Sequence, residues 1–128
     1  EATCGLKAIA PDALGGEDVF DIVVDGVGFE VTRAQASASV APGGVILHIG
    51  LGSAEGGLDI RRMTLQEITF VGTYTYTAQD FRDTSAAMFD GRLGALDWLE
   101  TRPLSDGGSA FADIRAGRVA APKIILKP

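Results

Sequence analysis

Several residues that could do chemistry stand where short apolar runs of the chain end in glycine. Asp25 closes the run Phe20–Asp25, and Gly26 and Gly28 follow it. A carboxylate at the end of a strand could act as an acid or base, line a ligand groove, or accept structural hydrogen bonds. The sequence favours the second and third of these roles and leaves both open.

A glycine-rich segment, Gly50–Gly57, follows the second apolar run, Val45–Ile49. A loop of this composition after a strand could cradle a phosphate group. However, it lacks the Gly-x-Gly-x-x-Gly spacing, and the next helical pattern begins only near Ile60. We therefore interpret the segment as a loop that is either plain or beside a bound ligand.

The chain has one histidine, His48, and one cysteine, Cys4. A zinc site needs several ligands, and the sequence shows no Cys or His cluster that could supply them. Strand alternation could place His48 on the face opposite Leu47 and Ile49, where we expect a hydrogen-bonded structural role. Cys4 has only Lys7 nearby in the sequence to lower its thiol pKa, so a reactive role has little support.

The composition excludes several classes of protein. A chain of 128 residues with 46% hydrophobic content supports one domain with a modest core. The net charge of −6 argues against a nucleic-acid partner, which would need a basic face. No apolar run approaches the ~20 residues that span a membrane.

The start of the chain and its single cysteine indicate a cytoplasmic protein. No signal peptide is visible at Glu1, and a single cysteine rules out an internal disulfide framework. The first residue is not methionine, so we expect that the chain begins inside a longer protein or was trimmed.

The hydrophobic pattern predicts strands that alternate with helices. Asp59 and Thr77 are expected to cap two of the helices at their N-termini. In the first helix, Val31, Ala34 and Ala38 are expected to form a packed face of small residues. The expected strands are 20–25, 45–49, 67–74 and 123–126, with a strand-like link at 96–99, and the expected helices are 30–40, 60–66, 78–89 and 107–116.

This order of elements implies an α/β fold with a parallel sheet and right-handed crossovers. Ligands of open sheets of this kind bind outside the carboxyl ends of the strands. Here those ends are Asp25–Gly28, Ile49–Leu51 and Thr73–Thr75.

Four motifs, taken in order, carry a family resemblance that covers residues 19–128. The motifs are the strand Asp21–Gly28, the turn Pro42–Gly44 into Val45–Gly50, the run Thr64–Thr77, and Ala112–Gly117 followed by Pro122–Leu126. With these motifs the chain resembles the last part of the cofactor domain of medium-chain zinc-dependent alcohol and polyol dehydrogenases. The third motif, Thr64–Thr77, looks closest to the polyol and sugar-phosphate branch, such as galactitol-phosphate or sorbitol dehydrogenases.

The resemblance implies a partial, truncated Rossmann-type parallel sheet with helices on both faces. Residues 1–128 would form a single domain, made of the second half of an NAD(P)-binding domain and a C-terminal return segment. The catalytic zinc domain, the glycine fingerprint and the acidic ribose-binding residue would lie outside the chain. NAD or NADP and zinc would therefore be cofactors of the parent protein, and the isolated chain would be inactive and bind NAD poorly.

The resemblance also assigns cofactor contacts. Glycines would be needed at the groove because a Cβ would hold the cofactor away from the backbone. The implied contacts are Asp25 and Gly26 on the adenine side, Ile49, Gly50 and Leu51 under the nicotinamide, backbone groups at Thr73 and Thr75 for the carboxamide, and Lys123 for the pyrophosphate.

The tyrosines of the third strand indicate a pairing edge. Tyr74 and Tyr76 would share one strand face, with the neighbouring threonines on the other. Strands at a sheet edge invite pairing with a second copy, and the corresponding strand of the family lies at a twofold axis. We therefore expect a homodimer through residues 68–76.

The implied activity is oxidation of a secondary alcohol in a polyol or sugar phosphate, with NAD(P) as hydride acceptor and zinc as Lewis acid. Three alternatives stay open: a zinc-free quinone reductase of the same superfamily, a non-enzymatic α/β interaction module, and a methyltransferase-like or regulatory α/β domain. The return strand at 123–126 disfavours the last of these, because it has no place in such a sheet.

Overall fold

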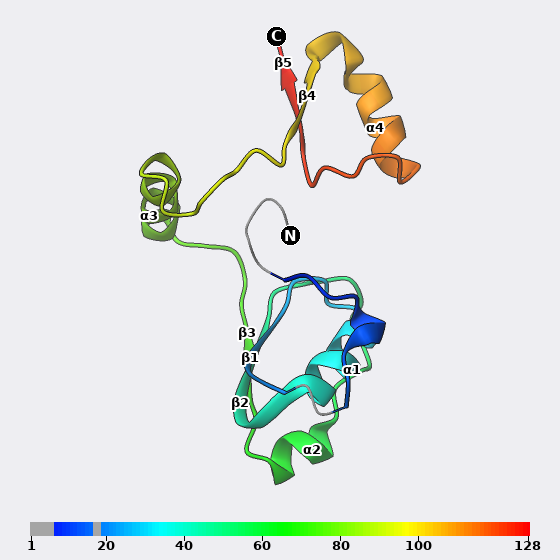
Figure 1. The fold of residues 1–128 in the computed structure, drawn as a ribbon, viewed down its shortest axis with the longest axis vertical. Coiled ribbons are helices and arrows are strands. Elements are labelled where there is room, and N and C mark those ends of the chain that lie inside the picture. Colours follow the sequence, from blue (N-terminus) through cyan, green and yellow to red (C-terminus); the bar gives the residue numbers. More distant parts are fainter. Residues whose placement is uncertain (1–6, 17–18) are drawn as a thin grey trace. The chain divides into compact units, whose positions relative to one another are not determined.

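The computed structural model describes residues 7–16 and 19–128, and its contacts divide the chain into two compact units. The first unit is Ile9–Thr77, and the second consists mainly of Ala78–Pro128 (Figure 1). The single domain expected from the sequence stays a prediction.

The first unit contains a three-stranded parallel sheet in the order β1-β2-β3. The strands are β1 (Phe20–Asp25), β2 (Val40–His48) and β3 (Thr69–Gly72). Asp25 is the register partner of His48, which in turn is the partner of Gly72, so the three carboxyl ends meet at one edge. The predicted α/β fold with parallel strands is confirmed.

Helices α1 (Glu30–Ser39) and α2 (Ile60–Leu65) cover one face of this sheet. The buried cluster joins Ala36 of α1 to Val40, Ile46 and Ile68, and Met63 of α2 packs against it. Because strand side chains alternate, Ile22 and Val24 of β1 point to the other face, where they are 65% and 57% exposed. Helices on that second face stay a prediction.

The predicted packing face of α1 is wrong. Val31 is 70% exposed, and Ala34 and Ala38 are exposed as well. The buried residues of the helix are Arg33, Ala36 and Ser37. The pattern missed this face because it contains an arginine and a serine, whose polar groups are satisfied by hydrogen bonds inside the protein rather than by water.

The short helix α2 begins as predicted and also supports the end of α1. The Asp59 side chain accepts a hydrogen bond from the backbone N–H of Arg62 at 2.8 Å, which confirms its N-cap role. The Arg62 guanidinium donates to the carbonyl oxygens of Ser37 and Val40. It thereby satisfies carbonyls at the C-terminal end of α1.

Two strand boundaries differ from the prediction. Strand β2 begins at Val40 instead of Val45, and Pro42–Gly44 lie inside it as an irregular stretch, since Gly43 has φ of 74° and the register with β1 shifts between Phe20 and Ile22. Strand β3 ends at Gly72, and Thr75 lies in the left-handed region with φ of 55°. The predicted strand alternation of Tyr74 and Tyr76 is therefore wrong, although both side chains are exposed.

The second unit contains the remaining helices and a two-stranded parallel sheet of β4 and β5. Helix α3 has its predicted bounds, and Gly91 follows it with φ of 71°. The predicted strand-like link at 96–99 is wrong, since the strand lies at 100–103, where it pairs with β5. The elements are α3 (Ala78–Phe89), β4 (Glu100–Pro103), α4 (Gly107–Arg115) and β5 (Ile124–Lys127), and the chain also has the short 3-10 helices η1 (Pro11–Ala13) and η2 (Leu104–Asp106).

A charged cluster links α4 to β4. Arg102 of β4 donates to Glu100 at 2.6 Å and to Asp113 of α4 at 2.7 Å. Arg118 donates to the other oxygen of Asp113 at 2.7 Å. The hydrogen bonds from Arg102 and then Arg118 lower the pKa of the Asp113 carboxyl. Because α4 and β4 share this carboxylate, the helix is fixed to the small sheet by more than its apolar side chains.

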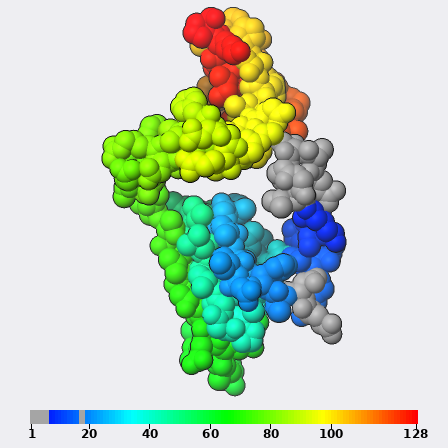
Figure 2. Space-filling model, turned by 60° about the vertical axis from the view of Figure 1, so that its left-hand side comes forward, coloured from blue at the N-terminus to red at the C-terminus, as the bar shows by residue number. Residues whose placement is uncertain are grey.

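Gly28 and Gly50 bring two loops of the first unit into direct backbone contact. A Cβ built on Gly50 would overlap the backbone of Val27 and Gly28, and a Cβ on Gly28 would overlap the backbone of Gly50. Gly28 also has a positive φ of 74°. The turn after β1 and the loop after β2 therefore fit together only without side chains at these two positions. Figure 2 shows the surface of this unit, coloured from blue to green.

We expect Gly50→Ala to lower the free energy of unfolding by about 2 kcal/mol or more, because backbone atoms on both sides would have to move. Gly72→Ala is the matched control, since a Cβ there meets nothing within 4 Å. We expect a change below about 1 kcal/mol for the control. Urea denaturation followed by circular dichroism measures both, and equal effects would contradict the close contact.

Candidate functional site

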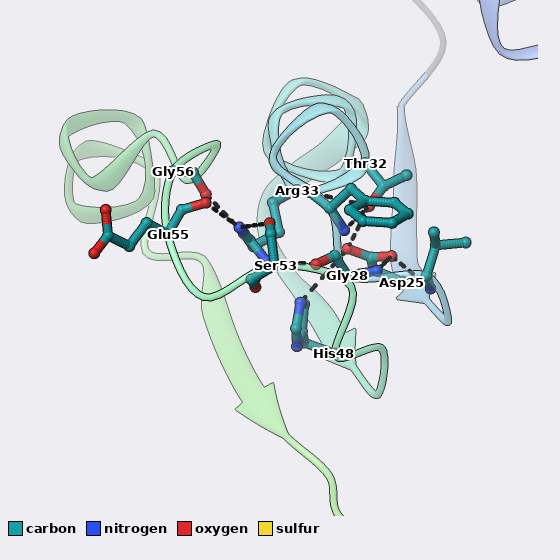
Figure 3. Close-up of polar contacts among 10 residues, drawn as sticks. Asp25, Gly28, Thr32, Arg33, His48, Ser53, Glu55 and Gly56 are labelled. Atoms are coloured by element: carbon teal, nitrogen blue, oxygen red, sulfur yellow. Dashed lines mark hydrogen bonds and ion pairs between the residues drawn. The ribbon is translucent and has the colours of Figure 1, made fainter.

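The candidate site lies at the carboxyl edge of β1, β2 and β3, where a buried carboxylate organises the first turn (Figure 3). Oδ1 of Asp25 accepts hydrogen bonds from the backbone N–H groups of Val27 and Gly28 at 3.0 and 2.8 Å. Its Oδ2 accepts from the Thr32 hydroxyl of α1 at 3.0 Å. The turn after β1 is thus tied both to itself and to the first turn of the helix.

The Asp25 carboxylate is ionised within this network. Burial alone would raise its pKa, but the hydrogen bonds from Gly28, Val27 and Thr32 stabilise the charged form, and the pKa lies below its ordinary value of 3.8. The residue is 4% exposed, so its oxygens serve the protein interior. This geometry favours the structural role, and a ligand would meet the backbone of the turn instead.

His48 faces the same carboxylate from the end of β2. Its Nε2 lies 3.6 Å from Oδ2 of Asp25, which is too long for a hydrogen bond, and makes none with the described residues. Its ring lies 5.4 Å from the ring of Phe70 on β3. The hydrogen-bonded structural role expected for His48 stays a prediction, and Nε2 does not provide that hydrogen bond with the described residues.

The loop after β2 exposes two of the predicted contact residues. Ile49 is 45% exposed and Leu51 is 80% exposed. Gly50 between them is buried, and its lack of a side chain is explained by contact with the turn after β1 rather than by a cofactor. Gly26 is different, because a Cβ built on it meets nothing within 4 Å and the open space is available to a ligand.

The predicted residues after β3 also lie at this edge. The backbone N–H of Thr73 already donates to the carbonyl of His48 at 2.9 Å, so this amide is not available to a ligand. Thr75 is exposed and has the left-handed backbone noted above. Contact with a carboxamide through these residues stays a prediction and would have to use other backbone or hydroxyl groups.

The remaining predicted residues lie elsewhere. Lys123 belongs to the second unit, where it is exposed and its carbonyl accepts from the backbone N–H of Glu100. Cys4 falls outside the described residues. Within residues 7–16 and 19–128, no three His, Cys, Asp or Glu side chains come together as a metal site, and no helix there is long and apolar enough to cross a membrane.

Two hollows flank the strand ends. One, of about 230 Å³, lies beside β1 and α1 and is lined in part by Asp25, Gly26 and Thr32. The other, of about 550 Å³, lies under the loop after β2 and is lined in part by His48 and Phe70. The edge therefore offers open space beside the end of β1 and beside the loop after β2.

Sequence reasoning missed Arg33, the residue that connects α1 to the loop after β2. Its guanidinium donates to carbonyl groups of Gly28 and of the loop, as Figure 3 shows. The only signal in the sequence was a charged residue at helical spacing from Ala36 and Ser37, which is also the pattern of a solvated face. Nothing in the neighbouring sequence distinguishes a buried arginine of this kind from an arginine on a solvated helix face.

Parallel strands joined by helices, with glycine turns at their carboxyl ends, are typical of open α/β sheets, whose ligands bind at that edge. The sequence profile described as zinc-binding dehydrogenase matches residues 6–90, which is more than half of the chain. The chain therefore belongs to the zinc-binding dehydrogenase family. The predicted resemblance to the C-terminal part of the cofactor domain of medium-chain dehydrogenases is confirmed.

Known proteins agree with this assignment. The chain is 26% identical over 99 residues to a probable D-xylulose reductase A of Neosartorya fischeri, a match that covers 77% of this chain and 28% of that protein. A thermostable alcohol dehydrogenase from Pyrobaculum aerophilum is 25% identical, with a TM-score of 0.74, over 92% of this chain and 35% of that one.

The fold is shared with an acetophenone reductase from Geotrichum candidum, solved in complex with NAD. It is 21% identical, with a TM-score of 0.76, over 96% of this chain and 35% of that one. The chain thus spans about a third of the length of these relatives.

We expect the stability contribution of the Asp25 charge to depend on pH. Because the folded pKa is below the unfolded one, the contribution is present above about pH 4 and is lost as the pH falls through the folded pKa. Asp25→Asn should therefore cost about 1–3 kcal/mol near pH 7, and the difference from the parent chain should shrink at lower pH.

Urea denaturation between pH 7 and pH 3 measures this difference. Asp21→Asn, at an exposed position on the same strand, is the control. A cost for Asp25→Asn that stays constant across this range would show that the charge does not stabilise the turn.

Proposed function

We propose that this chain is the C-terminal part of the cofactor domain of an NAD(P)-linked, zinc-dependent dehydrogenase that oxidises a secondary alcohol. The observation that supports the proposal most directly is the carboxyl edge of the sheet. Open backbone at Gly26 and exposed side chains at Ile49 and Leu51 lie there beside a turn held rigid by Asp25. Family membership supports the same function.

The described residues fit one side of a dinucleotide. Gly26 would lie against the adenine half of the cofactor, because its open face admits a flat group close to the backbone. Ile49 and Leu51 would offer an apolar surface to the nicotinamide and keep water away from it. When bound, the cofactor supplies hydride-transfer chemistry, and these residues contribute shape and orientation.

Other predicted contacts complete the proposal. Thr73 and Thr75 would bind the carboxamide through hydroxyl groups or backbone groups other than the Thr73 N–H. Lys123 would neutralise a phosphate charge. The described residues do not fit zinc, since they contain no cluster of ligands. We therefore place any zinc ligands in other residues of the protein.

A polyol or sugar-phosphate substrate is the finer part of the proposal. The run Thr64–Thr77 and the match to a probable D-xylulose reductase both favour this class of alcohol. We also propose a cytoplasmic protein that forms a homodimer through the segment 68–76, since β3 lies at the edge of the three-stranded sheet.

The proposed activity can be tested with the complete reading frame that encodes this chain. The purified protein would be assayed with NAD and NADP against xylitol, sorbitol and a galactitol phosphate, and its zinc content measured. We expect oxidation of at least one of these alcohols and loss of activity with a chelator. Reduction of quinones without zinc would indicate the related reductase class, and no redox activity would favour an interaction module.

The isolated chain gives a second check of the proposal. Residues 1–128 alone should show no dehydrogenase activity, because the chain spans only about a third of its relatives. Calorimetric titration should find NAD binding weaker than micromolar. A micromolar affinity would show that this half of the groove is sufficient, and the proposed division of the site would be wrong.

We expect Gly26→Val to weaken cofactor binding in the complete enzyme without destabilising it. A Cβ at this position meets no protein atom within 4 Å, so a small side chain fits the protein but would displace the cofactor. The KM for NAD(P) should rise by about tenfold or more, which corresponds to ~1.4 kcal/mol. Gly108→Ala, at an equally open position in the second unit, should leave the KM unchanged.

A further inference from the structure

Arg33 is a buried cation whose hydrogen-bond partners are all uncharged. The residue is 5% exposed, and its guanidinium donates to five acceptors on two loops. Nε donates to the carbonyl of Gly56 at 2.6 Å, and Nη1 to the carbonyls of Gly28 and Ser53 at 2.8 and 3.0 Å. Nη2 donates to the Ser53 hydroxyl at 2.9 Å and to the carbonyl of Glu55.

No ion pair involves Arg33 among the residues that the structure describes. A buried charge without a counter-ion is costly unless polar groups surround it. Here carbonyl and hydroxyl dipoles take the place of a carboxylate, and the planar fork of arginine matches their spread. The arginine and the loop therefore depend on each other, because either one alone would leave buried polar groups without partners.

Arg33 connects two segments of the candidate site, because its acceptors lie on both of them. Gly28 belongs to the turn after β1, and residues 53–56 belong to the loop after β2. The loop is also tied to the turn by backbone bonds from Gly52 to Val27 and from Ser53 to Gly28. Ile49–Leu51 lies between two anchors. The backbone N–H groups of Ile49 and Gly50 donate to the Asp25 carbonyl at 2.9 and 3.1 Å, and the loop that Arg33 binds follows directly after Leu51.

We propose that Arg33 is a positioning residue for the cofactor: by binding the carbonyls of Gly28 and of residues 53–56, it fixes the loop that presents Ile49–Leu51 to the nicotinamide. This inference rests on the proposed function. Arg33 itself touches no cofactor in this proposal and acts only through the loop.

Lysine cannot replace arginine in this role. A lysine would retain the positive charge but has one nitrogen with three donors, which cannot satisfy the five acceptors that the guanidinium binds. Ser53→Ala is a milder change that removes only the side-chain acceptor and leaves four carbonyls in place. Arg61→Met is the control for removal of a positive charge, because Arg61 is exposed on α2.

The first measurement is hydrogen exchange of peptides covering residues 50–57 in the complete protein. We expect Arg33→Lys to accelerate exchange in this loop by about tenfold, because the amides of Gly52 and Ser53 lose their fixed position. Peptides of β2 should change much less, and Arg61→Met should change neither. Unchanged exchange in the loop of both Arg33→Lys and Ser53→Ala would overturn the proposal.

The second measurement separates positioning from a merely structural role. In the complete enzyme, Arg33→Lys should raise the KM for NAD(P) by about tenfold and leave the KM for the alcohol within about twofold. Ser53→Ala should show the same pattern with a smaller effect. A faster-exchanging loop combined with an unchanged KM for NAD(P) would overturn the positioning role.

The two proposals fail in different ways. A wild-type protein that oxidises no alcohol with NAD or NADP overturns the proposed function, and the cofactor role of Arg33 with it. An active wild-type enzyme whose Arg33→Lys variant retains its KM for NAD(P) overturns only the present inference.

Discussion

The fit of the turn after β1 against the loop after β2 is the constraint on which the first unit depends. Gly28 and Gly50 meet backbone to backbone, and neither position has room for a Cβ. The Asp25 carboxylate holds the turn from inside, and Arg33 holds the loop from the side of the helix. The carboxyl edge of the sheet is therefore bordered by two loops that contact each other through backbone atoms alone.

The sequence predicted the elements well where local signals were strong. Strand Phe20–Asp25, the Asp59 cap and helix Ala78–Phe89 all followed from apolar runs, capping residues and a terminal glycine. The end of β3 did not, because the threonines and tyrosines after Gly72 have high strand propensity while Thr75 adopts a left-handed backbone. Propensity describes a residue, whereas the end of a strand is set by its partner strand, and β2 stops at His48.

The sequence predicted which strand ends meet at one edge of the sheet but not which interactions hold the adjoining loops. Strand order placed Asp25, Ile49 and Thr73 at one edge, and the parallel sheet brings those strand ends together. The sequence could not show that Asp25 is enclosed by amides and a hydroxyl, or that Gly50 is required by another part of the backbone. Arg33 lay beyond prediction because four of its five acceptors are main-chain carbonyls, up to 23 residues away, and every sequence has carbonyls.

The recognition of carbonyl groups by Arg33 has a consequence for how this family can diverge. Four of its five acceptors are main-chain oxygens, so the contact depends mainly on the path of the backbone and little on the side chains of the loop. Ala54 and Glu55 are therefore free to change identity as long as the chain keeps its course, whereas the Ser53 hydroxyl is an acceptor and Gly56 has a positive φ of 82°. Substitutions at Arg33 and in the loop after β2 would therefore not be correlated. Methods that infer contacts from correlated changes between positions would overlook this contact.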